Sequence, residues 1–136
     1  MKSLSPNLAV KDIKQTVAYY QDNFGFEIEM LVDSLQEDFS PQIKKEKDYI
    51  WALIKKGDVS IMLQEENSIK EDIGEFYKDI GASISLYIEV DDTDSLYEKV
   101  KENVEILKPI YTTWYGQKEF YIKDINGYIL GFSSKV

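Results

Sequence analysis

The chain of 136 residues contains no histidine and no cysteine. Imidazole is the commonest side-chain metal ligand and the usual proton shuttle near neutral pH, so its absence removes most metal chemistry and most general bases. Without thiols there is no disulfide framework, and the redox compartment stays undetermined. The first question about this chain is therefore whether it binds a compound rather than transforms one.

Long apolar runs are also missing. No segment approaches the roughly 20 apolar residues that a membrane-spanning helix requires. The first six residues, MKSLSP, lack the apolar core of about 7–15 residues that a signal peptide carries. A cytoplasmic location is the default expectation. Because an apolar fraction of 43% is ordinary for a globular protein, residues 1–136 are expected to form a single domain with a hydrophobic core.

Basic residues are outnumbered by acidic ones, 16 against 25, which gives a net charge of −9. Nucleic acids and anionic membrane surfaces require basic patches, so neither is expected as a partner. An acidic surface raises the local concentration of cations and therefore permits a cationic ligand. The alternative is that the acidity only keeps the protein soluble.

Residues 4–64 read as a strand, a helix, a strand and a hairpin. Asp12 has the side chain of a helix N-cap, with Gln15 as a capping-box partner, and Gly25 stands where a left-handed helix end is expected. The apolar face of this helix is Ile13, Val17, Tyr20 and Phe24. The strands are expected at 7–10, 26–32, 49–54 and 59–64, the last two joined by the turn Lys56-Gly57-Asp58.

Residues 84–136 repeat this order. Val90 and Asp92 correspond to Val10 and Asp12, each at an offset of 80 residues. A repeat in which order, caps and turns all agree is a strong sign of internal duplication. The chain is therefore expected to hold two β-α-β-β-β modules.

The second module has details of its own. A strand that begins at Val104 is expected to end at Leu107, because Pro109 stops it. Helical spacing precedes it at Leu96, Val100 and Val104. The remaining strands are expected at 84–90, 118–123 and 128–133, the last two joined by the turn Asp124-Ile125-Asn126-Gly127.

Two segments fall outside the repeat. Residues 33–48 are polar and charged, and they are interpreted either as a mobile flap or as a poorly ordered loop. Residues 65–83 form a linker that is expected to contain a short helix. Its apolar residues recur at helical spacing: Ile69, Ile73, Phe76 and Ile80.

Several motifs, in order along the chain, resemble those of the vicinal oxygen chelate superfamily, which includes glyoxalase I, extradiol dioxygenases, fosfomycin-resistance enzymes and bleomycin-resistance proteins. They are NLAVKD (7–12), NFGF (23–26), YIEVDD (87–92), WYGQKEFYIKD (114–124) and NGYILGF (126–132). The resemblance covers nearly the whole chain. It implies an α+β fold in which the paired modules curl a mixed sheet into a cup.

In the enzymes of that superfamily, inward residues from four strands hold one divalent metal ion. The resemblance places those four positions at Ser5, Met62, Ser85 and Gly131, with Gln64 one step along the face of Met62. Hydroxyls, a thioether and a glycine are poor ligands for a divalent metal, which prefers imidazole or carboxylate. No metal, cofactor or catalytic residue is therefore predicted. The alternative is a displaced metal site formed by Gln64, Glu89 and Glu119.

Strand alternation separates two faces in each module. One face is expected to pack beneath the helices: Leu8, Val10, Leu86, Ile88, Val90, Phe120, Ile122, Leu130 and Phe132. The other is expected to line the cup: Asn7, Trp51, Leu53, Met62, Gln64, Ser85, Tyr87, Glu89, Glu119 and Tyr121. Trp114 and Tyr115 are expected at its rim. The alternative is that the apolar members fill the cup and that the glutamates face water.

The sequence favours a metal-free small-molecule-binding protein of the bleomycin-resistance type, which sequesters a cationic or aromatic compound such as an antibiotic. The predicted ligand-binding residues are Trp51, Met62, Gln64, Ser85, Tyr87, Glu89, Trp114, Tyr115, Glu119 and Tyr121. The resemblance also implies a homodimer. Two alternatives stay open: a metal-dependent lyase, transferase or dioxygenase with a displaced site, and a non-catalytic regulatory module.

Overall fold

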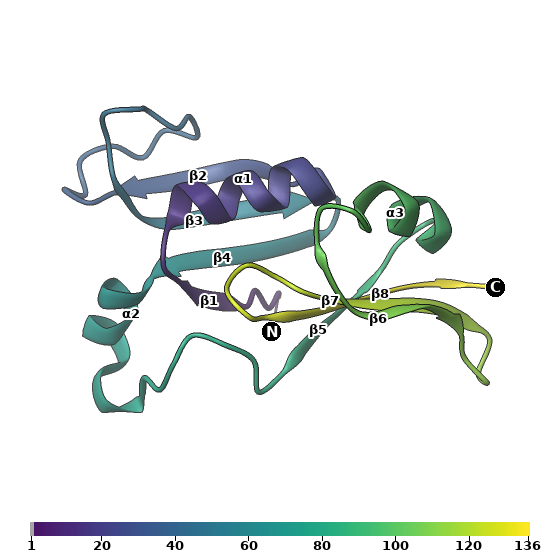
Figure 1. Ribbon diagram of the computed structural model, residues 1–136. Coiled ribbons are helices and arrows are strands. Elements are labelled where there is room, and N and C mark those ends of the chain that lie inside the picture. Colours follow the sequence, from purple (N-terminus) through teal and green to yellow (C-terminus); the bar gives the residue numbers. More distant parts are fainter. Residues whose placement is uncertain (1) are drawn as a thin grey trace. The chain divides into compact units, whose positions relative to one another are not determined.

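The computed structural model describes residues 2–136, and the chain divides after Ile80 into two compact units (Figure 1). Within these residues each unit holds one four-stranded sheet, in which the first strand runs parallel to the last and the other neighbours are antiparallel. The predicted α+β class and the duplicated module are confirmed. Among the described residues, no helix combines the length and the apolar content needed to cross a membrane.

The first unit is built on a sheet with the order β1-β4-β3-β2. Its elements are β1 (Asn7–Val10), α1 (Ile13–Phe24), β2 (Glu27–Asp33), β3 (Tyr49–Lys56), β4 (Val59–Glu65), α2 (Glu66–Ile73) and the short 3-10 helix η1 (Gly74–Phe76). Helix α1 packs across β3 and β4. It covers a core whose buried side chains include Val10, Val17, Tyr20, Leu31, Ala52, Ile54, Ile61 and Leu63.

Helix α1 begins and ends where the sequence predicts. The Asp12 carboxylate accepts a hydrogen bond from the Gln15 amide at 2.8 Å. Gly25 adopts a left-handed φ of 70°, and its amide donates to the Gln21 carbonyl at 3.0 Å. Few residues other than glycine adopt this conformation without strain, so Gly25 fixes the end of the helix.

The linker contains the expected short helix. Helix α2 is capped by Glu65, whose side chain accepts the amides of Asn67 and Ser68 at 3.0 and 3.2 Å. Its apolar face is only partly buried, because Ile69 is 9% exposed whereas Phe76 in η1 is 75% exposed. The segment is therefore held to the first unit by one end of its apolar face.

The second unit has the sheet order β5-β8-β7-β6. Its elements are β5 (Ser85–Glu89), α3 (Thr93–Val100), β6 (Glu105–Thr112), β7 (Gln117–Lys123) and β8 (Ile129–Lys135). Asp92 caps α3 by accepting the Ser95 amide at 3.0 Å. Of the predicted core residues here, these are buried beneath α3: Phe120, Ile122, Leu130 and Phe132. The β5 residues Leu86 and Ile88, and Val90 after them, are half-buried.

Strand β6 is longer than predicted. It continues to Thr112, so the expectation that Pro109 ends it at Leu107 is wrong. β6 lies at the edge of the sheet, where a proline is tolerated because one side of the strand has no partner to receive an N–H. The pairing with β7 shifts register on both sides of Lys108 and then places Tyr111 opposite Glu119.

The polar segment 33–48 forms a loop with internal contacts. Asp33 is 2% exposed, and its carboxylate accepts two backbone amides of the loop at 2.8 and 2.9 Å. The Asp38 carboxylate pairs with Lys44 at 2.6 Å and with Lys47 at 3.1 Å. The structure therefore favours an ordered loop over a poorly ordered one.

Candidate functional site

Tyrosine side chains and one glutamate gather on one face of the second unit's sheet. Phe120 packs against Tyr97 of α3, with ring centroids 5.2 Å apart. Its strand neighbours Glu119 and Tyr121 therefore point to the opposite face. We call the hydrogen-bonded residues on this face the tyrosine–glutamate cluster: Tyr87, Tyr111, Tyr115 and Glu119.

The Glu119 carboxylate is the centre of the cluster. Its residue has 0% exposure, and it accepts hydrogen bonds from three phenols. The hydroxyls of Tyr87 and Tyr115 donate to Oε1 at 2.6 and 2.8 Å, and that of Tyr111 donates to Oε2 at 2.8 Å. A buried carboxylate without partners is strongly disfavoured, so these phenols stabilise the charge as well as surround it.

The electrostatics of the cluster favour an ionised Glu119. Burial opposes the charged form, but the hydrogen bonds from the three tyrosines, together with the charge of Lys108, outweigh it and lower the pKa of Glu119. The same bonds act in reverse on the phenols: the bond to Glu119 raises the pKa of Tyr87 and, with burial, raises that of Tyr115 to about 12. The cluster is therefore an ionised carboxylate that accepts hydrogen bonds from three phenol hydroxyls.

Small side chains on β8 allow the cluster to form across a strand. Tyr87 on β5 pairs with Gly131 on β8, and Glu119 on β7 pairs with Ser133 on β8. β5 and β7 are therefore separated by β8. A glycine and a serine leave room for the Tyr87 side chain to pass over β8 and reach Glu119.

Gly131 also makes room for Tyr121, its partner on β7. A Cβ atom added to Gly131 would lie 2.5 Å from Cε1 of the Tyr121 ring. The ring therefore occupies the space where any side chain at position 131 would begin.

Aromatic rings at the edge of this face are exposed to water. Trp114 is 94% exposed and Tyr115 is 51% exposed, and their ring centroids lie 5.2 Å apart in an edge-to-face arrangement. Tyr87 is 53% exposed. Trp114 and Tyr115 belong to the turn between β6 and β7, where the sequence placed the rim of a binding site.

The corresponding face of the first unit is apolar, with one buried amide. Trp51, Leu53 and Met62 are half-buried. Gln64 is 6% exposed, and its Oε1 accepts a hydrogen bond from Asn7 at 2.8 Å. Its Nε2 donates to Ser68 Oγ and Asp72 Oδ2 at 2.9 and 2.7 Å. Gln64 therefore ties β1 and α2 to β4.

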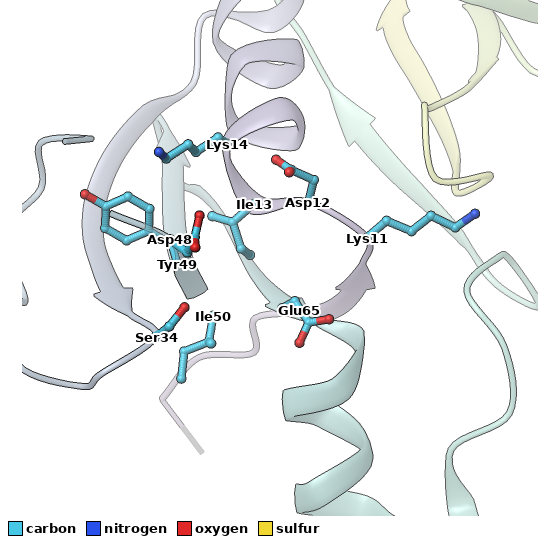
Figure 2. Close-up of a pocket in the computed structure, with 9 residues that line it drawn as sticks. All are labelled: Lys11, Asp12, Ile13, Lys14, Ser34, Asp48, Tyr49, Ile50 and Glu65. Carbon is cyan, nitrogen blue, oxygen red and sulfur yellow. The ribbon is translucent and has the colours of Figure 1, made fainter. Parts of the chain in front are cut away.

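A separate cavity of about 230 Å³ lies in the first unit at the beginning of α1 (Figure 2). Its lining is Lys11, Asp12, Ile13, Lys14, Ser34, Asp48, Tyr49, Ile50 and Glu65, none of which is a predicted site residue. Several of its polar groups already have partners. Asp12 caps α1, Glu65 caps α2, and Lys14 donates to the Lys45 carbonyl at 3.1 Å. Two of the acidic side chains that line this cavity are therefore already used to cap α1 and α2.

The structure brings three predicted ligand-binding residues into direct contact: Tyr87, Tyr115 and Glu119. Ser85 and Glu89 are exposed at the two ends of β5. Because β8 separates β5 from β7, Glu89 and Glu119 do not stand on neighbouring strands, the arrangement that a shared acid–base site would need.

Sequence reasoning missed two residues of the site, Tyr111 and Lys108. Tyr111 completes the shell around Glu119, and the Lys108 ammonium lies 3.8 Å from the centroid of the Tyr111 ring. Both lie on β6. Both lie beyond the predicted strand end at Leu107, and the register shifts on either side of Lys108 place Tyr111 opposite Glu119.

A sequence model of the Glyoxalase/Bleomycin resistance protein/Dioxygenase superfamily matches residues 4–132. The chain belongs to this superfamily. No curated protein sequence matches it significantly. Membership agrees with the resemblance drawn from the motifs and leaves the activity of this member open.

Solved structures share the superfamily fold at low sequence identity. A protein of unknown function from Agrobacterium tumefaciens str. C58 is 23% identical with a TM-score of 0.75, and the match covers 100% of this chain and 95% of that one. A glyoxalase-related enzyme from Fulvimarina pelagi is 16% identical, with a TM-score of 0.72 and coverage of 98% and 88%. The bleomycin-binding protein of Streptomyces verticillus, complexed with copper(II)-bleomycin, is 22% identical, with a TM-score of 0.61 and coverage of 100% and 99%.

The resemblance assigns the metal positions of the superfamily's enzymes to Ser5, Met62, Ser85 and Gly131, and hydroxyls, a thioether and a glycine are poor donors for a divalent ion. The Tyr121 ring fills the space above Gly131, and the amide of Gln64 is bound to its own neighbours. Glu119, which the displaced site would need, is enclosed by three phenols. Over residues 2–136, no group of three or more carboxylates is placed to hold a metal ion.

Proposed function

We propose that this protein binds and sequesters a small molecule that is cationic, aromatic or both, such as an antibiotic, and that it does so without a catalytic metal. The observation that carries the proposal is the tyrosine–glutamate cluster. One buried carboxylate is enclosed by phenols, and the rings of Tyr87 and Tyr115 are half exposed above it. The cluster offers charge and aromatic surface, and the phenols enclose the one carboxylate that could act as a base or a nucleophile.

Aromatic faces bind planar rings, and they attract cations through the negative potential above the ring. A carboxylate beneath the rings adds to that attraction in a medium of lower dielectric than water. Contiguous exposed apolar surface marks binding sites more often than single exposed residues do, and the exposed Trp114 ring lies beside that of Tyr115. Together these features favour a ligand that combines a ring with a positive charge.

Two further observations support the proposal. The net charge of −9 raises the concentration of cations near the protein. The bleomycin-binding protein among the solved structures binds a small molecule with the same fold. Homodimer formation and a cytoplasmic location belong to the same proposal.

Tryptophan fluorescence tests the function directly, because the two tryptophans lie in different units. Trp51→Phe leaves Trp114 beside the cluster as the reporter, and Trp114→Phe leaves Trp51. Titrating both variants with cationic and neutral aromatic compounds is expected to give a saturable change in the Trp51→Phe protein for at least one compound. The matched Trp114→Phe protein is expected to respond much less.

If no compound in the panel gives a saturable change in the tryptophan fluorescence of either variant, the proposal is wrong. A saturable change in fluorescence that is seen only in the Trp114→Phe protein would place the binding site in the first unit. Binding that appears only with added zinc, nickel or iron would support the metal-dependent alternative.

A further inference from the structure

One lysine already places a cation on the cluster. The Lys108 ammonium lies 3.8 Å from the centroid of the Tyr111 ring, closer than Lys70 to Tyr77 at 5.0 Å. Among the residues that the structure describes, the Lys108 ammonium forms no ion pair, whereas Lys123 on β7 pairs with Glu105 at 3.2 Å. The direct contact of Lys108 is therefore the ring, and its charge also acts on the nearby Glu119 carboxylate.

The ring beneath Lys108 is well suited to hold a cation. The Tyr111 hydroxyl donates to the Glu119 carboxylate at 2.8 Å. Donating to a negative charge polarises the phenol and increases the electron density of its ring, which strengthens the attraction of a cation above it. Tyr87 and Tyr115 are polarised by the same carboxylate.

The hydrogen-bonding state of Glu119 selects the kind of cation. Its Oε1 already accepts two phenol bonds and its Oε2 accepts one, and the residue has no exposed surface. Oε2 keeps one acceptor site, but because Glu119 is buried a ligand N–H donor reaches it only if the surrounding phenols move apart. A quaternary ammonium has no N–H to satisfy and needs only the field of the carboxylate and the faces of the rings.

We propose that the tyrosine–glutamate cluster is a binding site for a quaternary ammonium group, and that Lys108 is its internal competitor, occupying the Tyr111 face until the ligand cation replaces it. This inference rests on the proposed function for the location of the ligand. It adds the chemical class of the ligand's charged group. It also predicts the direction in which replacing Lys108 changes the affinity for that ligand. Removing this lysine tightens binding, whereas removing a lysine that binds an anionic ligand would weaken it.

Three small probes separate charge, shape and hydrogen bonding. Choline carries a quaternary ammonium, 3,3-dimethylbutan-1-ol has the same shape without the charge, and ethanolamine carries a primary ammonium. NMR titration of the full chain is expected to show that choline binds more tightly than either of the others. Lys108→Ala is expected to tighten choline binding by about two- to fivefold, the equivalent of one exposed cation–π contact.

Two matched variants control for charge. Lys108→Arg restores a cation over Tyr111 and is expected to bind choline no more tightly than the parent chain. Lys99→Ala removes the same charge from α3 on the other side of the sheet and is expected to leave choline affinity near the parent value. Glu119→Gln keeps the shape of the side chain and is expected to weaken choline by about tenfold, while the neutral alcohol is unaffected. If Glu119→Gln does not fold, the Lys108 series decides alone.

The inference is overturned if Lys108→Ala weakens choline binding or leaves it unchanged, if the neutral alcohol binds as tightly as choline, or if ethanolamine binds more tightly than choline. Its failure is distinguishable from that of the proposed function. A neutral aromatic ligand found by fluorescence, with no binding of choline, removes this inference and leaves sequestration standing. Choline binding that responds to Lys108, with a flat response to the aromatic panel, keeps this inference and the cationic part of the proposed function and removes the aromatic part.

Discussion

Gly131 has no side chain, and this absence determines how the neighbouring residues pack in the second unit. Gly131 has no Cβ, so the Tyr121 ring lies against the backbone of β8 and Tyr87 passes over the same strand. The resemblance assigns this position to a metal-binding carboxylate in the superfamily's enzymes. Here the same space is taken by a ring, and the nearest carboxylate on the neighbouring strand, Glu119, is held by phenols.

Gly131→Ala is expected to lower the free energy of unfolding by about 1–3 kcal/mol, because the new Cβ would lie 2.5 Å from Tyr121 Cε1 and the ring would have to move. Urea unfolding of the parent chain and the variant measures this loss.

The matched background for that substitution is Tyr121→Ala, which removes the ring. In this background Gly131→Ala is expected to cost little, since the clash is gone and alanine is no worse than glycine in a strand interior. Equal losses in both backgrounds would show that the contact with Tyr121 is not the cause.

At the scale of an element, β6 and the loop 33–48 behave differently from their sequence patterns. The sequence pattern predicts a strand end at Pro109, but the edge position of β6 accommodates the proline, and the strand continues to Thr112. The loop has the composition of a disordered segment, yet the buried Asp33 organises it from within. In both cases specific contacts, the strand pairing of β6 and the hydrogen bonds of Asp33, determine the outcome rather than local composition.

The loop is expected to loosen in acid. Hydrogen bonds from the loop, the amide of Asp38 first, hold the pKa of the Asp33 carboxyl below its usual 3.8, with Lys47 contributing. A carboxyl with a lowered folded pKa adds stability that is complete above the unfolded value and is lost as pH falls through the folded value. NMR shifts of the Glu37 and Asp38 amides, which donate to Asp33, are therefore expected to titrate with a midpoint below 3.8.

Asp33→Asn is the control for this titration, because it keeps an acceptor oxygen and loses the ionisable group. The part of the amide titration that comes from Asp33 is expected to disappear in that variant, which leaves only the effect of the residues' own carboxyl groups. A midpoint above 3.8 in the parent chain would mean that folding does not favour the ionised Asp33.

At the scale of the whole molecule, the excess of acidic residues adds a long-range attraction to the local one. The net charge of −9 concentrates cations near the surface at low salt. Raising the ionic strength from about 0.01 M to 1 M shortens the screening length from about 30 Å to about 3 Å. Choline binding is expected to weaken several-fold over this range, with the remaining affinity due to the cluster itself.

The neutral 3,3-dimethylbutan-1-ol serves as the reference in the same salt series and is expected to show no such weakening. The same NMR titration reports both affinities. If choline affinity were constant with salt, or if the alcohol lost affinity equally, the net charge would have no part in recognition.

Much of the fold could be predicted because its signals are local. The caps at Asp12 and Asp92 and the left-handed end at Gly25 depend on residues within a few positions of one another. The hairpins follow from turn residues in the same way. The candidate site was predictable only in part. Glu119 and Tyr87 could be placed on one face by alternation, whereas their hydrogen bond depends on the pairing of β5 with β8, two strands that are far apart in sequence.

By itself the sequence determined the duplicated α+β architecture and the superfamily, because periodicity, caps and motifs are properties of the chain. It also determined that imidazole and thiolate ligands for a metal are absent. Only the tertiary structure decided that Glu119 is buried and that three phenols from β5, β6 and the turn after it converge on its oxygens. It also decided that Lys108 stands over one of those rings. Burial and convergence arise from strand order and register, which bring distant residues together, and no local pattern in the sequence encodes them.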